Sequence, residues 1–347
     1  MNQDIKLVII SNEKTFSNKN KFFCNNIDMK SIPEGLNHHL ETILIARKSY
    51  NKKFNEINLK GIKIFSNIIN FIYGIVKTFK YKNAKYLLIS VTPYTFASYL
   101  LLFIFRKKTF IYLRSNGHEE YKAIFGFWGP LIYHIMYTVV TFQSRIIVCQ
   151  KKLTKKSSDL VFPSELNKSW LKNTYTPLLD KPRLLYVGRI KVEKGIFAFL
   201  DLFKSISDDM ELSITGNEDD IKINNFYKKD SFIQLKKINF LGYANGSKKL
   251  IKIYDEHNIT ILPSFTEAHP KIIDESLARE RPVIVFEDIR HAVKNKYGVF
   301  ISKRDVPSIT KIIKFIMNNY SDIKIDMSKN KLPTKEKFIV QMSNILK

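Results

Sequence analysis

Short apolar runs alternate with amphipathic stretches along most of the chain, and this alternation predicts parallel sheets flanked by helices. In the first half, the predicted strands are residues 5–10, 86–91, 109–114 and 145–149, and the predicted helices lie around 34–47, 66–79 and 94–105. In the second half, strands are predicted at 183–188, 211–216, 238–242, 258–264, 281–286 and 298–302, and helices at 195–206, 247–256, 270–279 and 306–319. The predicted fold class is therefore α/β, with two doubly wound parallel-sheet domains.

The alternation breaks at residues 163–182, which lose their periodicity and collect Pro, Asn and Lys. We therefore predict an N-terminal domain of residues 1–165, a linker of residues 166–182 and a C-terminal domain of residues 183–330. Residues 331–347 are predicted to contain one last amphipathic helix after a proline break. A length of 347 residues suits two domains of ordinary size.

One apolar stretch is longer than the strands and helices around it. Residues 123–142 contain no Lys, Arg, Asp or Glu and have nearly the length of a membrane span, whereas the apolar run at 94–105 is too short for one. Basic residues flank both runs: Arg106, Lys107, Lys108 and Lys122. Two buried or half-buried helices are the favoured interpretation. An aromatic surface resting on an anionic membrane is the second, and a transmembrane helix is the third.

The charge of the chain points to an anionic partner. Its 57 Lys and Arg outnumber its 32 Asp and Glu, which gives a formal net charge of +25. Such an excess favours polyanions or anionic membrane surfaces. A nucleic-acid-binding protein would interleave aromatic with basic residues, but here the aromatic residues lie in uncharged runs, so no nucleic-acid partner is expected.

The cysteines and the N-terminus indicate an intracellular protein. Cys24 and Cys149 lie far apart without a CxxC pattern, which predicts neither a disulfide framework nor a thiolate metal site. The first apolar run is too short for a signal peptide. We expect a cytoplasmic protein, and peripheral attachment to the inner face of the membrane stays open. The histidines lack metal-ligand spacing, and the acids of 216–220 are interpreted as loop residues, so no metal site is predicted.

The first candidate motif is "LLYVGRIKVEKGI", in which an apolar run ends at Gly188. Arg189 follows at once and Lys194 comes a few residues later. Ligands of open α/β sheets bind beyond the carboxyl ends of the strands, which is where these cations lie.

The second candidate motif is "LPSFTEAHPKIIDESLA". A buried strand is followed by a loop with Glu267, and Pro270 opens a helix that carries Glu275. Two carboxylates so placed can hold hydroxyls of one extended ligand. The positive end of the helix, with its free amides, can receive a phosphate between them.

Together, "GRIKVEKG" and "PSFTEAHPKIIDESLA" resemble the C-terminal domain of the family 4 retaining glycosyltransferases, also called glycosyl transferase group 1. The resemblance covers residues 183 to about 320. It implies the GT-B fold, in which two Rossmann-like domains face a cleft and a C-terminal helix crosses back to the N-terminal domain. It also implies metal-independent transfer of a hexose-type sugar from a UDP- or GDP-sugar to a lipid-linked or oligosaccharide acceptor. A surface polysaccharide, lipopolysaccharide or capsule pathway is the implied context.

The resemblance assigns a role to each candidate residue. Arg189 and Lys194 hold the diphosphate of the nucleotide sugar, Glu267 contacts sugar hydroxyls, and Glu275 contacts the ribose. The implied donor-binding set also includes Gly188, Gly216, His269, Pro270 and Lys271. The nucleotide sugar is a co-substrate, so the family implies no resident cofactor.

The N-terminal half offers one candidate, in "YLRSNGHEEYK". Family members often carry a histidine near this point that faces the sugar, which implies a catalytic role for His118. The alternative is a polar loop whose side chains only cap the next helix.

The chain departs from the family pattern at two places that bear on activity. Ala268-His269-Pro270 replaces the usual Gly-Phe-Gly, and the first strand leads into "SNEKTFSNKNK" without a Gly-Gly turn. Full transferase activity is therefore one hypothesis among several. The others are a GT-B nucleotide-sugar epimerase, a degenerate donor-binding relative and a non-catalytic basic protein that binds nucleic acid.

Overall fold

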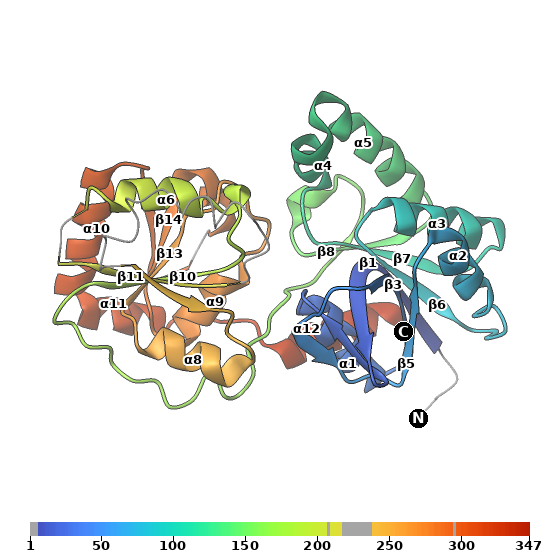
Figure 1. Cartoon of the computed structure of the whole chain (residues 1–347), viewed down its shortest axis with the longest axis horizontal. Helices are drawn as coiled ribbons and strands as arrows, with labels where there is room; N and C mark the ends of the chain where they lie inside the picture. Colours follow the sequence, from blue (N-terminus) through green and yellow to red (C-terminus); the bar gives the residue numbers. More distant parts are fainter. Residues whose placement is uncertain (1–5, 207–208, 217–237, 294–295) are drawn as a thin grey trace. The chain divides into compact units, whose positions relative to one another are not determined.

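The computed structural model describes residues 6–206, 209–216, 238–293 and 296–347, and it divides into two compact units. The N-terminal unit comprises Met1–Pro163 and Lys335–Lys347, and the C-terminal unit comprises Ser164–Thr334. Each unit is a largely parallel sheet with helices on both of its faces (Figure 1). The predicted α/β class with two parallel-sheet domains is confirmed.

The described strands of the N-terminal unit form one sheet in the order β5-β3-β1-β6-β7-β8-β9, with β2 and β4 beside the far end of β1. Their bounds are β1 Lys6–Asn18, β2 Lys21–Cys24, β3 Glu41–Ser49, β4 Asn55–Ile57, β5 Gly61–Phe65, β6 Lys85–Ile89, β7 Thr109–Leu113, β8 Arg145–Val148 and β9 Asp159–Leu160. All neighbours are parallel except β2, which runs antiparallel to β1 and β4. The core strands β1, β6 and β7 carry continuous apolar runs because helices cover both faces of the sheet.

Helices α2 (Ile68–Val76), α3 (Pro93–Ile104), α4 (Gly117–Phe125) and α5 (Gly129–Val140) cover one face of this sheet. Helix α1 (Asp28–Asn37) and helix α12 (Lys335–Leu346), from the far end of the chain, cover the other face. The Phe338 ring of α12 lies 6.4 Å from the Tyr112 ring of β7, and Lys85 Nζ donates to the Leu346 carbonyl at 2.7 Å. The C-terminal helix thus returns to the N-terminal unit, as the family resemblance implied.

The predicted helix at 34–47 is wrong. Helix α1 ends at Asn37, and the apolar residues after Leu40 form β3. Strand β3 is paired on both edges, with β1 and with β5, and is buried on both faces. A strand in that position has no polar alternation, so its sequence is indistinguishable from that of a buried helix.

The segment after the first predicted strand also forms regular structure. Strand β1 continues to Asn18, and β2 pairs back onto it with Phe16 opposite Phe23. The turn residues Lys19 and Asn20 both have positive φ, of 45° and 63°, as a two-residue type I′ hairpin requires. Where the family places a Gly-Gly turn, this chain has a β-hairpin.

The described strands of the C-terminal unit are all parallel, in the order β12-β11-β10-β13-β14-β15. Their bounds are β10 Arg183–Val187, β11 Glu211–Thr215, β12 Ile238–Gly242, β13 Ile259–Leu262, β14 Val283–Phe286 and β15 Val299–Ser302. The described α-helices of this unit are α6 Ile196–Phe203, α8 Ser247–Asp255, α9 Lys271–Ala278, α10 Val306–Asn318 and α11 Tyr320–Met327. The strand order reverses between β10 and β13, and ligands of doubly wound sheets bind at such a switch point.

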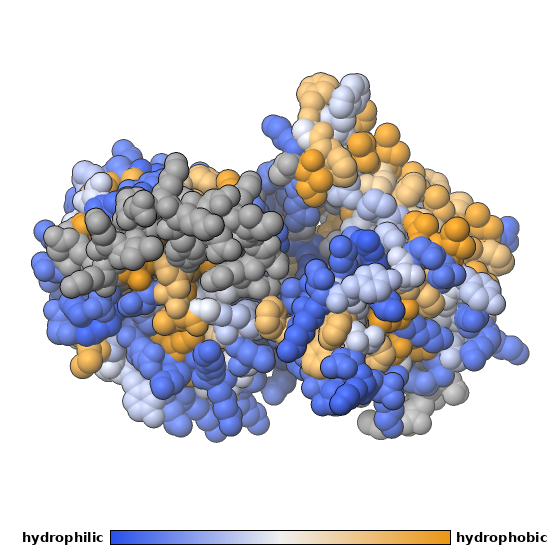
Figure 2. Space-filling view, in the orientation of Figure 1, coloured by the Kyte–Doolittle hydropathy of each residue, from blue (hydrophilic) through white to orange (hydrophobic). Residues whose placement is uncertain are grey.

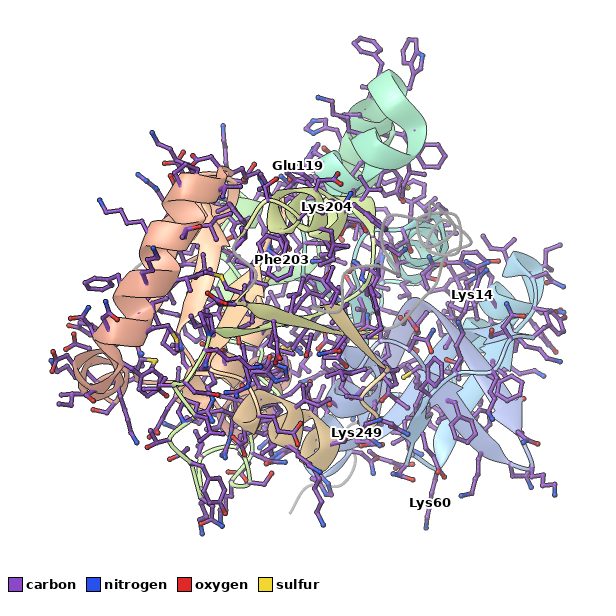
Figure 3. The ribbon with its side chains drawn as sticks, turned by 60° about the vertical axis from the view of Figure 1, so that its left-hand side comes forward. Lys14, Lys60, Glu119, Phe203, Lys204 and Lys249 are labelled. Carbon is purple, nitrogen blue, oxygen red and sulfur yellow. The ribbon has the colours of Figure 1, made fainter. Side chains whose placement is uncertain are left out.

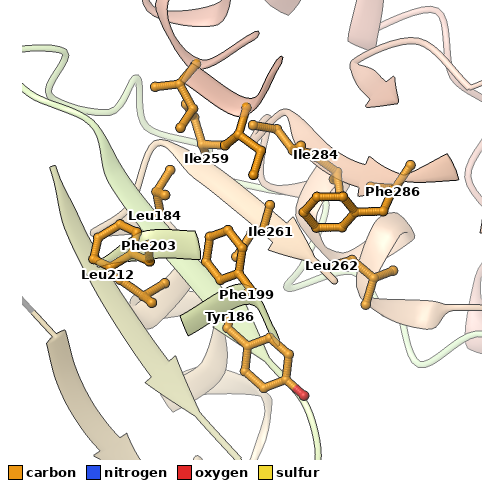
Figure 4. Close-up of a cluster of buried hydrophobic side chains, with 14 of the residues drawn as sticks. Leu184, Tyr186, Phe199, Phe203, Leu212, Ile259, Ile261, Leu262, Ile284 and Phe286 are labelled. Atoms are coloured by element: carbon orange, nitrogen blue, oxygen red, sulfur yellow. The ribbon is translucent and has the colours of Figure 1, made fainter. Parts of the chain in front are cut away.

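A dense apolar core fixes the strand ends at this switch point (Figure 4). Leu184, Ile261 and Phe286 from three strands and Phe199 from α6 are all buried in it. Tyr186 lies at the edge of the core, and its hydroxyl donates to the Arg189 carbonyl at 2.6 Å. The core thereby holds the turn that follows β10.

The long apolar stretch 123–142 forms the end of α4, a 3₁₀ turn at Gly126–Trp128, and α5. Tyr133, Met136 and Val140 of α5 are buried against the sheet, whereas Leu131 and Ile135 are about half exposed. The interpretation as half-buried helices is correct. Within the described residues, we find no helix with both the length and the apolar character needed to cross a bilayer.

Candidate active site

Two glycines bring the ends of β10 and β11 together. A Cβ on Gly216 would lie 1.7 Å from the Gly188 carbonyl oxygen, and the Gly188 N–H donates to the Thr215 carbonyl at 3.0 Å. Only glycine fits at position 216 without moving the main chain. Arg189 follows the close approach with its side chain 58% exposed, and its guanidinium lies 3.9 Å from the Glu193 carboxylate.

The loop after β10 packs on the end of β13 through Gly195. This residue has φ +65°, and a Cβ on it would lie 1.9 Å from the Pro263 carbonyl oxygen. The Phe265 N–H donates to the Glu193 carbonyl at 3.2 Å, which ties the two loops together a second time. Two strand ends far apart in sequence therefore form one surface.

Lys194 and Glu267 form an ion pair on this surface. Lys194 Nζ lies 2.6 Å from Glu267 Oε1, and Ser264 Oγ donates to the same oxygen at 2.8 Å. The two charged side chains are 21% and 12% exposed, so solvent screens the pair only partly. Two donors on one oxygen fix the orientation of the carboxylate.

Arg304 supports the loop that carries Glu267. Its guanidinium donates to the Pro263 carbonyl at 2.7 Å and to Asp288 Oδ2 at 2.9 Å. It also lies over the rings of Phe265 and Phe286, 4.1 and 4.3 Å from their centroids. This arginine holds the end of β13 in place by charge-assisted hydrogen bonds and cation–π contacts.

Glu275 lies on helix α9, which follows the loop that carries Glu267. Pro270 precedes the helix, and no described side chain caps its first turn. Burial raises the pKa of Glu275 to about 7, against the opposing effects of Lys271 and of the Tyr254 hydroxyl, which donates to Glu275 Oε2 at 3.2 Å. Lys271 Nζ lies 3.1 Å from Glu165 Oε1. Glu275 is thus a buried carboxyl that titrates near neutrality.

His269 lies on the loop between the two glutamates and faces a buried acid. Its Nε2 lies 3.8 Å from Asp274 Oδ2, and Asp274 is only 2% exposed and ion-paired with Lys296. On the other side of the loop, the His291 ring is 3.1 Å from the Glu267 carbonyl. These contacts hold the loop that replaces the Gly-Phe-Gly of the family.

His118 belongs to the N-terminal unit, where it lies in the first turn of α4. Its ring packs 4.7 Å from the Tyr133 ring, and its Nε2 lies 3.4 Å from His134 Nδ1. Burial, and secondarily His134, lowers the pKa of His118, which favours the neutral imidazole. A neutral ring of this kind can donate or accept a hydrogen bond.

The structure brings together Arg189, Lys194 and Glu267 at the switch point of the C-terminal unit, and it places Lys271 and Glu275 on the helix that follows. The sequence interpretation missed their partners: Glu165, Glu193, Tyr254, Ser264 and Arg304. Only Glu193 and Ser264 lie inside the two motifs, so no local signal could have identified the other three.

The arrangement can bind a ligand that carries an anionic group and, close to it, hydroxyl groups. Arg189, Lys194 and Lys271 each lie next to a carboxylate that a phosphate can replace, and α9 directs its positive end toward the loop. No cluster of three or more metal-binding side chains occurs within the described parts of the chain. The acidic residues 218–220, interpreted above as loop residues, lie outside those parts.

Comparisons with known proteins agree with this geometry. Residues 171–337 match the family described as glycosyl transferases group 1. The search of curated protein sequences gave no match. The family match covers both candidate motifs of the C-terminal unit.

Solved structures resemble the whole chain. Sucrose-phosphate synthase from Thermosynechococcus elongatus has a TM-score of 0.71 at 16% identity, with 98% of each chain covered. The HepE protein of Anabaena, solved with UDP and glucose, has a TM-score of 0.70 at 10% identity and the same coverage. The lipopolysaccharide outer core galactosyltransferase WaaB has a TM-score of 0.65 at 15% identity, again with 98% of each chain covered. The chain therefore has the GT-B fold, and its residues 171–337 match the glycosyl transferases of group 1.

Proposed function

We propose that this chain is a retaining, metal-independent glycosyltransferase that moves a hexose-type sugar from a UDP- or GDP-sugar to a lipid-linked or oligosaccharide acceptor. The observation that carries the proposal is the convergence of Arg189, Lys194 and Glu267 where β10 and β13 end. The solved complex of HepE with UDP and glucose supports a nucleotide-sugar donor.

The cations of the site would stabilise the leaving diphosphate. Negative charge accumulates on the diphosphate as the glycosidic bond breaks, and fixed cations at that point lower the barrier. Arg189 is exposed, so its guanidinium can turn from Glu193 to the phosphates, and the ammonium of Lys194, with three N–H donors, can contact a phosphate while it keeps its ion pair with Glu267. The N-terminus of α9, close to His269 and Lys271, adds main-chain amides and a positive dipole. This supplies charge stabilisation without a metal ion.

The two glutamates would hold different parts of the donor. Glu267 has one oxygen fixed by Lys194 and Ser264, and its other oxygen would accept hydrogen bonds from sugar hydroxyls. Glu275 is buried further along α9 and would accept from the ribose. The bare main chain at Gly188 and Gly216 lets the donor approach the strand ends closely.

A retaining transfer at this site requires no enzymic nucleophile. The departing phosphate oxygen takes the proton of the acceptor hydroxyl on the same face of the sugar. His118, as a neutral imidazole, would hydrogen-bond a sugar hydroxyl, the role that the family resemblance implies for it. We place the reaction at the cytoplasmic face of the membrane, in the assembly of a surface polysaccharide.

Ligand stabilisation is the experiment that tests the function. UDP or GDP should raise the melting temperature of the protein in EDTA, since a ligand that binds only the folded state stabilises it. If neither nucleotide changes the melting temperature with or without a divalent metal, the proposal fails. Products formed from a nucleotide sugar without an acceptor distinguish the two enzymes: an epimerase converts the sugar, whereas a transferase waits for the acceptor.

A further inference from the structure

The exposed apolar side chains of this protein are concentrated on one helical layer. About half of the exposed large hydrophobic residues that the structure describes lie between residues 68 and 142, although this is only a fifth of the chain. Figure 2 shows them as the apolar areas over α4–α5 and over α2–α3. Single exposed apolar residues are ordinary on a protein surface, but a gathering of this size marks a binding surface.

The most exposed part of the layer is the turn between α4 and α5. Phe127 is 86% exposed and Trp128 is 63% exposed, and their rings pack edge to face 5.6 Å apart. The adjoining turns of the two helices carry more exposed apolar residues: Ile124, Phe125, Leu131, Ile132 and Ile135. We call residues 124–135 the apolar tip.

Close helix packing preforms the tip. A Cβ on Gly129 would lie 2.0 Å from the Tyr121 carbonyl oxygen, and a Cβ on Gly117 would lie 2.0 Å from the Tyr133 ring. The two glycines let α4 and α5 pack at close range, and the Tyr121 and Tyr133 rings pack against each other at a tilt of 51°, with their centroids 5.3 Å apart. The aromatic tip is therefore carried on a closely packed helix pair, which lowers the cost of ordering it when it binds.

A second apolar area lies on the neighbouring helices of the same face. Ile69 and Tyr73 of α2, and Ile104 and Phe105 at the end of α3, are each more than half exposed. Basic residues surround this area and the tip: Lys77, Lys80, Arg106, Lys107, Lys108 and Lys122. The two acids of α4, Glu119 and Glu120, lie in its first turn, at the opposite end from the tip.

Charge favours one occupant of this surface over another. A second copy of the chain would bring two molecules with a net charge of +25 together at their basic margins, and like charges oppose that contact. An anionic bilayer offers an apolar interior for the tip and negative headgroups for the basic margin.

We propose that the apolar tip inserts Phe127 and Trp128 into the interface of an anionic lipid bilayer, while the basic residues around α2 and α3 contact its headgroups. The inference deepens the proposed function, because it names the surface that would bring a lipid-linked acceptor to the enzyme. All residues proposed to contact the bilayer belong to the N-terminal unit. The His118 that we propose near the sugar lies at the base of the same helix pair.

The two tryptophans of the chain provide a direct measurement. Trp128 is exposed at the tip, whereas Trp170 is 2% exposed in the core of the C-terminal unit. Vesicles of phosphatidylcholine and phosphatidylglycerol with brominated acyl chains should therefore quench about half of the tryptophan emission. Trp128→Phe should still bind these vesicles and lose the quenching, because Phe replaces the anchor and the buried Trp170 remains out of reach. Binding of the wild type without quenching would show that the tip stays out of the bilayer, and would overturn the proposal.

Substitution of the tip tests whether it supplies the affinity. Phe127→Ser with Trp128→Ser should weaken vesicle binding roughly tenfold or more, the effect of losing two aromatic side chains from an apolar environment. Tyr50→Ser with Leu178→Ser is the matched control, since both residues are more than 70% exposed and lie outside the layer, and it should bind like the wild type. Equal losses in both double variants would overturn the proposal.

The salt dependence of binding and the oligomeric state of the protein distinguish an anionic bilayer from the other possible partners of this surface. Binding should fall as ionic strength rises and should be weaker on neutral phosphatidylcholine vesicles. If the protein binds neutral vesicles at high salt as strongly as anionic vesicles at low salt, the basic residues around the tip do not contribute to binding. A dimer in sedimentation that the tip substitutions dissociate would assign the surface to a second copy instead. UDP or GDP stabilisation of the tip variant separates this test from the proposed function, because the donor residues lie in the other unit.

Discussion

The N-terminal and C-terminal units arrange their parallel strands in the same order around a central first strand, which is β1 in one unit and β10 in the other. The chain continues differently after these two strands. In the C-terminal unit, β10 ends at Val187, and Gly188, Arg189 and Lys194 follow in the turn. In the N-terminal unit, β1 continues to Asn18 and folds back as a hairpin. The common strand order therefore provides a place for a ligand, and the residues after the strand decide whether polar groups occupy it.

The outer faces of the helices differ as well. Helix α10 of the C-terminal unit exposes only Phe315 among its large hydrophobic residues, whereas α5 of the N-terminal unit exposes Leu131, Ile132 and Ile135. Both helices bury apolar residues against their sheets. The difference lies on the side that does not pack against the sheet, and it agrees with the proposed attachment of the N-terminal unit to a membrane.

The largest expected effect concerns the cations at the end of β10. Arg189→Ala and Lys194→Ala should each lower the transfer rate by about 10²-fold or more, the scale for losing one charge contact to a transition state. Lys249→Ala, which removes an exposed lysine of α8 (Figure 3), should leave the rate unchanged. Single-turnover rates with a competent acceptor measure this. Wild-type rates in both Arg189→Ala and Lys194→Ala would show that the cations after β10 take no part in the transfer.

The glycine that joins the loops of the C-terminal unit should be the next most sensitive position. Gly195→Ala combines an unfavourable positive φ with a collision at the Pro263 carbonyl, and should lower the free energy of unfolding by about 3 kcal/mol. Gly242→Ala has the same φ of +65° but nothing within 4 Å of the new Cβ, and should cost only about 1 kcal/mol. Urea unfolding measures both. Equal losses would mean that the two loops do not need the close approach.

The buried carboxyl of α9 should make stability depend on pH. The pKa of Glu275 is about 7 in the folded protein and about 4.5 when the side chain is solvated, so the folded state binds this proton more tightly. Its contribution is fully present below about pH 4.5 and is lost as the pH rises through about 7. The free energy of unfolding of the wild type, relative to Glu275→Gln, should therefore fall by about 2–3 kcal/mol between these limits.

Glu256→Gln is the matched control, because this glutamate is exposed at the end of α8. Its difference from the wild type should stay constant across the same pH range. If the difference in the free energy of unfolding between Glu275→Gln and the wild type is constant as well, Glu275 is solvated. The proposal of a buried ribose-binding carboxyl would then be wrong.

The division of labour between the glutamates should give the smallest effect. Glu267→Gln should lower turnover about tenfold more than it weakens binding of the free nucleotide, because the sugar contact matters only while the sugar is present. Glu275→Gln should weaken the nucleotide and the nucleotide sugar alike. Calorimetry beside single-turnover rates separates the two patterns. If Glu267→Gln damages nucleotide affinity as severely as Glu275→Gln, the assignment of sugar and ribose is reversed or absent.

Local sequence was sufficient for part of this description. Gly188, Arg189 and Lys194 lie within one turn, and Glu267 and Glu275 lie on one loop and its helix, so their spacing already indicated a joint site. The β-branched runs of the C-terminal strands and the proline before α9 likewise predicted those elements.

Pairing between distant segments was beyond the sequence. Whether residues 41–47 form a helix or a strand depends on β1 and β5 at their two edges, and nothing inside the segment expresses that. Arg304 supports the Glu267 loop from another strand end, and Tyr254 reaches Glu275 from α8. Such partners become visible only once the chain is folded.

Calorimetric titration of UDP and GDP in EDTA, into the wild type and into Arg189→Ala with Lys194→Ala, tests the central claim most directly. The claim is that cations at the end of β10 hold the diphosphate of a nucleotide-sugar donor. The account predicts that one of the two nucleotides binds the wild type, that the double variant binds it roughly 10²-fold or more weakly, and that the corresponding nucleoside binds both proteins equally. Equal affinity of the nucleotide for the two proteins would contradict the claim.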